Sequence, residues 1–142
     1  MIKPLKVHEK EHTTEKEIMV AINERNGYVI KNQASSTTGK GRPDLSACIK
    51  GKYYGIEVKR PNSSLSTTPY QVKTLRSIAK AGGFACYSKT ADMFNLRKYA
   101  VKTVKFKTVI TNEEVKPLLR KKAVMVLQII DDKTVKLYQQ KG

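Results

Sequence analysis

The sequence has few acidic residues, two cysteines and no long hydrophobic run. Its 142 residues include only 12 aspartates and glutamates, against 28 lysines and arginines. The longest apolar runs, such as residues 123–127, fall far short of the roughly 18 residues that a membrane-spanning helix needs. The first six residues also lack the apolar core of a secretory signal. We therefore expect a cytoplasmic protein with no membrane segment.

The scarcity of cysteine argues against a fold held by disulfides or by a cysteine-rich zinc site. Cys48 and Cys86 have no second cysteine or histidine at zinc-binding spacing. Each lies in an apolar, strand-like stretch, so we expect two buried free thiols. A chain of this length can bury a hydrophobic core without such cross-links, and we interpret residues 1–142 as a single domain.

The excess of basic residues gives the chain a formal net charge of +16 at neutral pH. A field of this sign attracts polyanions and accelerates their encounter with the protein. Nucleic acid is therefore the first partner to consider, although a basic surface can also serve solubility or an anionic protein partner. Charge alone identifies neither the type of nucleic acid nor a reaction.

Periodicity and turn residues predict an ordered core between residues 13 and 90. Residues 1–12 show little periodicity and are predicted to be a flexible basic lead-in. Ile18 and Ile22 recur at helical spacing, and Thr68 and Pro69 are typical of a helix start. The predicted elements are a helix at 15–26, strands at 28–33, 45–50 and 53–60, a helix at 69–81 and a strand at 84–87. The order is therefore α-β-β-β-α-β.

Residues 91–142 are predicted to form a β-rich C-terminal extension. The pattern indicates a short helix at 93–99, a strand at 101–108, a helix at 112–122 that Pro117 interrupts, and a hairpin with arms at 123–130 and 134–138. Neither an internal repeat nor a long linker separates this extension from the core.

The hairpin at 45–60 places ionic side chains on one face of a strand. Alternate side chains of a strand share a face, so Glu57 and Lys59 point away from the apolar pair Ile56 and Val58. A two-residue turn at Gly51-Lys52 would place Asp44 opposite Lys59 and Ser46 opposite Glu57. Asp44, Glu57 and Lys59 would then converge at one end of the hairpin.

Two carboxylates held a few ångströms apart repel each other unless a cation lies between them. Hard oxygen ligands favour Mg²⁺, with Mn²⁺ as a substitute. Such an ion lowers the pKa of a bound water and neutralises charge that develops at phosphorus. The ammonium of Lys59 could orient an attacking water or stabilise a negative transition state beside the ion.

These residues resemble a known nuclease motif. Residues 41–44, Gly-Arg-Pro-Asp, followed by Glu57-Val58-Lys59 resemble the PD-(D/E)xK motif of the restriction-endonuclease-like fold. The stretches 15–18, 42–45, 56–61, 69–71 and 81–84 are similar to the VRR-NUC branch, and archaeal Holliday junction resolvases share most of this signature. The resemblance covers residues 13–90 and implies an α/β fold with a mixed central sheet flanked by helices.

The resemblance implies a role for each residue of the motif. Asp44 and Glu57 would be metal ligands, the backbone carbonyl of Val58 a further ligand, and Lys59 the catalytic lysine. The implied activity is that of a Mg²⁺-dependent endodeoxyribonuclease that hydrolyses phosphodiesters by in-line attack of water.

The family pattern also expects a glutamate from the first helix and a glutamine near the site. Both Glu15 and Glu17 qualify by sequence, and we favour Glu15 because it shares the helix face of Ile18, whereas Glu17 turns toward solvent. Gln71 matches the glutamine, and it is equally suited to form a capping box with Thr68. The two roles of Gln71 are compatible.

The substrate predicted from this resemblance is DNA. Lys40, Arg42, Arg60 and the lysine-rich C-terminal tail are expected to contact its backbone, with selectivity for branched DNA such as a Holliday junction or a flap. The family implies a homodimer that acts in recombination or repair, in a bacterium, an archaeon or a phage-infected host cell. The alternatives are a nucleic-acid-binding module with a silent active site and a basic RNA-binding protein.

Overall fold

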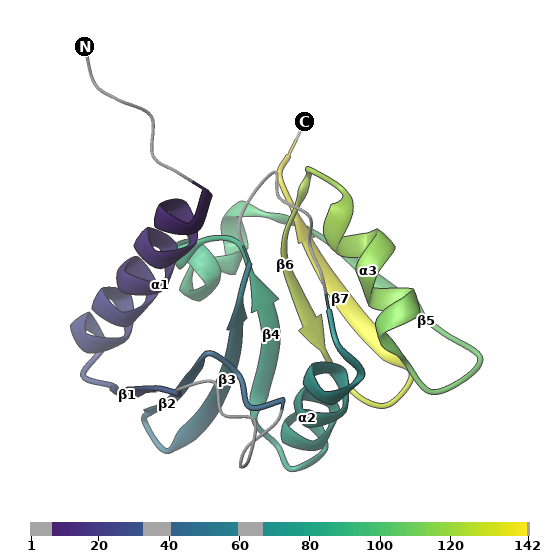
Figure 1. The fold of residues 1–142 in the computed structure, drawn as a ribbon, viewed down its shortest axis with the longest axis horizontal. Coiled ribbons are helices and arrows are strands. Elements are labelled where there is room, and N and C mark those ends of the chain that lie inside the picture. The colour runs from purple at the N-terminus through teal and green to yellow at the C-terminus, as the bar shows by residue number, and fades with distance from the viewer. Residues whose placement is uncertain (1–6, 33–40, 60–66, 142) are drawn as a thin grey trace.

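The computed structural model describes residues 7–32, 41–59 and 67–141, without the side chains of residues 7–12. Figure 1 labels the elements of this part of the chain. In chain order they are α1 (Val7–Glu24), β1 (Tyr28–Lys31), β2 (Leu45–Ile49), β3 (Lys52–Val58), α2 (Pro69–Lys80), β4 (Phe84–Ser88), the 3₁₀ turns η1 (Ala91–Phe94) and η2 (Leu96–Lys98), β5 (Ala100–Lys105), α3 (Asn112–Arg120), β6 (Val124–Ile129) and β7 (Thr134–Gln139).

The strands of the described ranges form one mixed sheet in the order β1-β2-β3-β4-β6-β7-β5. Strands β3 and β4 run parallel, with α2 as the connection between them, and the other neighbouring pairs are antiparallel. The predicted α-β-β-β-α-β order and the flanking helices are therefore confirmed. This is the fold class that the motif resemblance implied.

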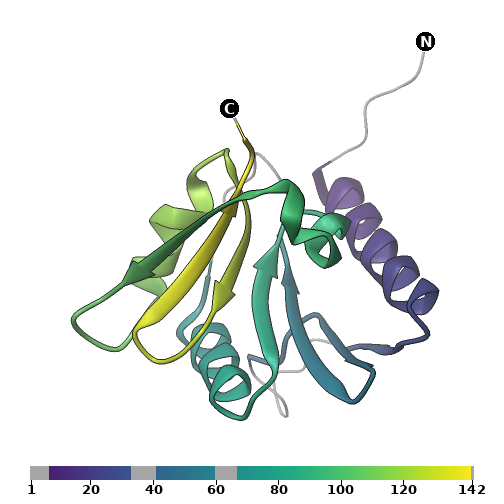
Figure 2. The ribbon, with the colours of Figure 1, turned by 180° about the vertical axis from the view of Figure 1, so that it is seen from behind.

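Helices cover both faces of the sheet. On one face, α1 packs Ile18 and Ile22 against apolar residues of β2 and β3 such as Leu45. On the other face, α2 and α3 pack around a second core that includes Leu75 and Leu119. Figure 1 shows α2 and α3 in front of the sheet, and Figure 2, from the opposite side, shows α3 behind the strands and α1 beside them.

The first helix is longer at its N-terminus than predicted. It begins at Val7 and ends at Glu24, whereas the predicted helix spans residues 15–26, so Thr13 and Thr14 lie inside it. Part of the predicted flexible lead-in is therefore helical. The polar residues before Thr13 carry no apolar periodicity, which is why the sequence pattern did not mark them as helical.

The second helix begins as its sequence predicts. The Thr68 hydroxyl accepts a hydrogen bond from the Gln71 amide at 3.2 Å, and the Gln71 side-chain oxygen accepts one from the Thr68 amide at 3.3 Å. This reciprocal capping box fixes the helix start at Pro69.

The C-terminal extension enlarges the sheet rather than forming a separate layer. Strands β6 and β7 form the predicted hairpin, and β5 pairs with β7 at the outer edge. The α3 helix accommodates Pro117 within its length, and two 3₁₀ turns replace the predicted short helix at 93–99. Within the described ranges, none of the helices is long and apolar enough to cross a lipid bilayer.

The two cysteines lie in different environments. Cys86 is buried, as predicted, whereas Cys48 is exposed, so the prediction of a buried thiol was wrong there. In β2, Cys48 alternates with the buried residues Ala47 and Ile49 and therefore projects from the opposite face. It lies between Tyr28 and Tyr53, which are themselves exposed, on a part of that face where the sheet remains open to solvent.

Candidate active site

The β2–β3 hairpin sets the position of the two motif carboxylates. Its turn is Lys50-Gly51, with φ values of 51° and 80°, and Ile49 pairs with Lys52. The predicted Gly51-Lys52 turn was therefore wrong by one residue. The last pair of the ladder, Leu45 with Ile56, places Asp44 opposite Glu57 at the next step, rather than opposite Lys59 as predicted. Directly opposed residues share a face, with Cβ atoms roughly 5 Å apart.

Asp44 ends the ladder between the two strands. Its Oδ2 accepts a hydrogen bond from the Val58 amide at 2.8 Å. A continued ladder would pair Val58 with Pro43. Instead, the Pro43 carbonyl accepts a hydrogen bond from the Asn32 side chain at 2.8 Å. The strands therefore part at this point, and the Asp44 carboxylate lies in the gap.

The Val58 carbonyl faces the same gap. In a strand, the amide and carbonyl of one residue point to the same side. The Val58 amide points to Asp44, and the next amide, from Lys59, points the other way to the Ser88 carbonyl on β4 at 2.8 Å. The backbone thus aligns the Val58 carbonyl with the Asp44 side of β3.

Glu57 is buried beside the aromatic ring of β4. Only 5% of Glu57 is exposed, and it pairs with Tyr87 across the parallel strands, so the two side chains share a face. Burial, followed by the negative charge of Glu57, raises the pKa of both the Tyr87 hydroxyl and the Cys86 thiol. Tyr87 thus lies beneath the site as a neutral neighbour of the carboxylate.

Lys59 lies directly after β3, on the face of Glu57 and Tyr87. Its ammonium is 5.7 Å from the centroid of the Tyr87 ring, a cation–π distance that keeps the charge over the site. The structure therefore brings Asp44, Glu57, Val58 and Lys59 to one end of the hairpin, as the sequence predicted.

Glu15 contacts a lysine of β1. Its carboxylate forms an ion pair with Lys31 at 3.0 Å, and its side chain is 12% exposed. Lys31 pairs with Leu45, whose side chain belongs to the core beneath α1, so Glu15 approaches the sheet from the face opposite to Glu57. Glu17 is exposed on α1, as predicted.

The loop that carries Arg42 and Asp44 lies against the start of α2. Gly41 has a φ of 81°, and a Cβ at this position would lie 2.5 Å from the Tyr70 carbonyl oxygen. Only glycine therefore fits this contact. It brings Arg42, which is exposed, and Asp44 close to the first turn of α2.

That first turn also carries Gln71. Because the Gln71 oxygen serves the capping box, its amide group is the part of the side chain that could donate to a phosphate. The other two predicted DNA contacts, Lys40 and Arg60, lie outside the described residues.

A second lysine near the strand ends has a structural role. Lys89 follows β4 and is 5% exposed, and its ammonium donates to the Lys121 carbonyl at 3.2 Å. Burial lowers the pKa of Lys89. This contact joins the end of β4 to the end of α3 and so attaches the extension to the core.

The oxygen donors at this site suit a small hard cation. Among the described side chains, no group of three or more histidine, cysteine, aspartate or glutamate residues is placed to hold a metal. Two carboxylates, from Asp44 and Glu57, and one carbonyl, from Val58, remain. Mg²⁺ is commonly bound by one or two carboxylates and several waters, so this donor set fits it.

Two contributors were not identified from the sequence. Asn32 donates to the Pro43 carbonyl and to the Ser46 hydroxyl, both at 2.8 Å, and so holds the loop before Asp44. The Tyr87 side chain lies beside Glu57 on the same face of the sheet. Neither belongs to the motif: Asn32 acts through the pairing of β1 with β2, and Tyr87 through the pairing of β3 with β4.

Comparisons with known proteins found one similar solved structure. No protein-family model matches the chain, and no curated protein matches it. One solved structure, described as a VRR_NUC domain, is similar to it with 26% sequence identity and a TM-score of 0.43. The similar region covers 52% of this chain and 77% of that one.

Proposed function

We propose that this protein is a metal-dependent endonuclease that hydrolyses phosphodiester bonds in DNA. The observation that carries the proposal is the opposition of Asp44 and Glu57 where β2 and β3 part, with Lys59 on the same face. This cluster favours a cation between its two carboxylates, because like charges disfavour one another, and an anion beside its lysine. A cation and an anionic substrate together would satisfy it.

Asp44, Glu57 and the Val58 carbonyl would hold Mg²⁺ or, as a substitute, Mn²⁺. When bound, such an ion would lower the pKa of a coordinated water and offset negative charge at phosphorus. Lys59 would orient the attacking water or stabilise the phosphorane-like charge from the side of Tyr87. Glu15 remains a candidate fourth ligand that would have to exchange Lys31 for the metal.

The basic balance of the chain supports delivery of DNA to this end of the sheet. The net charge of +16 favours any polyanion. Arg42 is exposed in the loop before Asp44, and Gln71 lies in the first turn of α2, which the same loop contacts through Tyr70. These groups, together with Lys40 and Arg60, would contact phosphates and contribute no base recognition.

We further propose that the substrate is branched DNA, a Holliday junction or a flap, and that two copies act together in recombination or repair in the cytoplasm of a microbial or phage-infected cell. Contacts to the DNA backbone read shape rather than sequence. A homodimer would allow both strands of a junction to be cut.

The test is cleavage of labelled linear duplex, single strand, flap and four-way junction with Mg²⁺, Mn²⁺ or EDTA. Asp44→Asn keeps the size of the side chain and removes its charge. Asp131→Asn, in the exposed turn between β6 and β7 at the opposite edge of the sheet, is the matched control. We expect metal-dependent cutting that Asp44→Asn reduces by at least 10³-fold, on the order of a lost catalytic group, and that the control retains.

Other results would replace the proposal. Tight DNA binding with no cutting under any metal would favour the silent module. Preference for RNA that is indifferent to metal and to Asp44→Asn would favour the RNA-binding alternative.

A further inference from the structure

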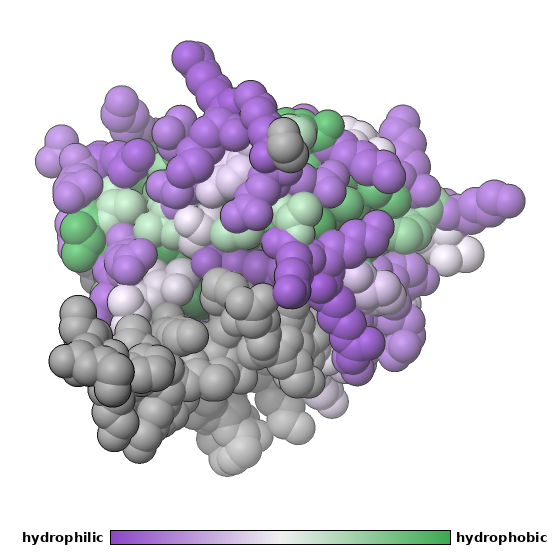
Figure 3. All heavy atoms as spheres, turned by 90° about the horizontal axis from the view of Figure 1, so that it is seen from above, coloured by the Kyte–Doolittle hydropathy of each residue, from purple (hydrophilic) through white to green (hydrophobic). Residues whose placement is uncertain are grey.

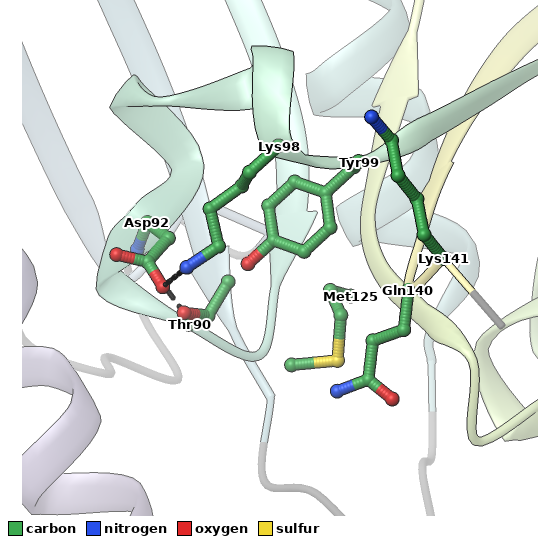
Figure 4. A pocket seen from close by; sticks show the side chains of 7 residues that line it. All are labelled: Thr90, Asp92, Lys98, Tyr99, Met125, Gln140 and Lys141. Atoms are coloured by element: carbon green, nitrogen blue, oxygen red, sulfur yellow. Dashed lines mark hydrogen bonds and ion pairs between the residues drawn. The ribbon is translucent and has the colours of Figure 1, made fainter.

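A pocket of about 430 Å³ lies at the junction of the core and the C-terminal extension. Figure 4 shows Lys98 and Tyr99 on one side of it, Gln140 and Lys141 on the other, and Met125 between them. Lys98 ends η2, whereas Gln140 and Lys141 directly follow β7. Segments that are distant in sequence therefore build this pocket together.

The pocket lies at the same end of the strands as the candidate active site, the end where β3, β4 and β7 finish; we call this end of the sheet the strand-end edge. The pairs Val58 with Ser88, Ser88 with Val126, and Val126 with Tyr138 form one row across β3, β4, β6 and β7. Lys59 follows the first member of this row and Gln140 lies just beyond the last. Adjacent strands are about 4.8 Å apart, so three strand spacings, roughly 14 Å, separate these two strand ends along the sheet. The pocket lies on the α1 face, where Tyr99 and Met125 pack, and the candidate active site lies on the α2 face, where Tyr87 packs.

This edge is strongly basic on the side of the extension. Figure 3 views it from above and shows hydrophilic side chains around a narrow apolar band. The exposed basic residues that the extension contributes next to the strand ends are Arg97, Lys98, Arg120, Lys121, Lys122 and Lys141. A continuous polyanion that leaves the candidate active site along this edge would meet them in turn.

The groups around the pocket are suited to a ligand that carries a single negative charge and several hydrogen-bond acceptor oxygens. The Asp92 carboxylate binds the Lys98 ammonium and fixes its position at the rim. Two lysines and one aspartate leave one net positive charge. The Thr90 hydroxyl and the Gln140 amide also line the pocket and can donate hydrogen bonds to an anion.

We propose that this pocket binds a backbone phosphate of the DNA whose cleavage occurs at Asp44 and Glu57. A phosphodiester carries one negative charge, which the pocket balances, whereas a terminal phosphate carries nearly two. Three strand spacings along the sheet correspond to about four base-pair steps at 3.4 Å each, and the DNA would reach the pocket across the strand ends. The extension thus lengthens the DNA track, and this inference rests on the proposed function for the identity of the polyanion.

The test compares two pairs of lysines in the full-length protein. Lys98→Gln with Lys141→Gln removes both pocket cations. Lys52→Gln with Lys133→Gln removes two exposed lysines at the opposite edge of the sheet and changes the net charge equally. Binding to a fluorescent DNA duplex is measured in EDTA, without cleavage, from low to high NaCl.

Each lost phosphate contact lowers the slope of log K against log salt by about 0.9. Because the pocket would bind one phosphate, we expect the pocket pair to lower the slope by about 0.9 and to weaken binding roughly tenfold at low salt, while the control pair retains the slope. Equal slopes for the two pairs would overturn the proposal. If the double variant unfolds, Lys141→Gln alone, at an exposed position beyond β7, is expected to lower the slope by up to about 0.9.

Cleavage assays on the same proteins separate this inference from the proposed function. If the wild type cuts DNA and the pocket pair matches the control pair in binding and cutting, the pocket proposal fails and the nuclease remains. If the wild type binds without cutting and only the pocket pair loses salt dependence, the nuclease proposal fails and the pocket remains.

Discussion

Asp44 and Glu57 face each other across β2 and β3 at the step where the two strands part. Like charges in this position repel each other, and a bound Mg²⁺ would offset the repulsion. We expect 10 mM Mg²⁺ to raise the free energy of unfolding by about 1.4 kcal/mol if the dissociation constant is about 1 mM. Thermal unfolding in Mg²⁺ and in EDTA measures the shift.

Asp44→Asn should abolish this shift and stabilise the protein in EDTA, because one of the two opposed charges is gone. Its amide oxygen can still accept the hydrogen bond from the Val58 amide. Asp131→Asn is the control, and it should retain the wild-type response. An equal Mg²⁺ response in both variants would place the bound ion elsewhere on the protein.

The face of the motif residues was predictable from the sequence, but their register was not. The prediction placed glycine first in the hairpin turn, whereas Lys50 adopts the left-handed conformation before Gly51. This changes the partner of Asp44 from Lys59 to Glu57, a step of two residues. A step of two keeps every side chain on its face, so the predicted cluster survived the error.

Other parts of the site depend on contacts that local patterns do not encode. The pairing of Glu15 with Lys31 depends on how α1 crosses the sheet. The place of β5 outside β7 depends on pairing between distant segments, which strand propensity leaves open. The pocket between η2 and the end of β7 follows only once that pairing is known.

The Glu15–Lys31 ion pair leads to a second prediction. If Glu15 acts through this contact, Glu15→Gln and Lys31→Gln should each reduce DNA cleavage less than tenfold and lower the stability by roughly 1 kcal/mol or less. The double variant should be little worse than either single one, as measured by urea unfolding. Loss of cleavage in Glu15→Gln as complete as in Asp44→Asn, with Lys31→Gln active, would identify Glu15 as a metal ligand.

The two cysteines should differ in reactivity. Burial, followed by the charge of Glu57, raises the pKa of Cys86, whereas Cys48 is exposed. The thiolate is the reactive form. We therefore expect one thiol per chain to react rapidly with a thiol reagent in the native protein, and the second to react only after unfolding. Cys48→Ser should remove the rapid equivalent. Rapid reaction that persists in this variant would show that Cys86 is accessible.

The capping box of α3 should make part of the free energy of unfolding depend on pH. Hydrogen bonds from the Thr111 hydroxyl and then from its amide lower the pKa of Glu114. A lowered pKa in the folded state stabilises the protein above the ordinary glutamate pKa of about 4.3, and this contribution is lost as the pH falls through the folded-state value.

Glu114→Gln should therefore be less stable than the wild type at pH 7 and nearly equal to it near pH 3. Because Glu114 is only partly buried and lies at the surface, the difference should not exceed about 0.5 kcal/mol. Urea unfolding at both pH values measures it, with Glu113→Gln from the same turn as the control. A difference that is unchanged at pH 3 would mean that the charge of Glu114 contributes nothing.

The hairpin turn allows the register itself to be tested. Lys50 has a φ of 51°, which costs a lysine roughly 1 kcal/mol or more, and asparagine tolerates this conformation better. Asn-Gly is the preferred pair for a turn with two left-handed residues. Lys50→Asn should therefore raise the free energy of unfolding by about 0.5–1 kcal/mol and leave DNA cleavage unchanged.

Lys52→Asn, in the first position of β3, should be neutral or destabilising because asparagine is disfavoured in strands. If Lys52→Asn were the stabilising change instead, the turn would be Gly51-Lys52 and Asp44 would lie opposite Lys59.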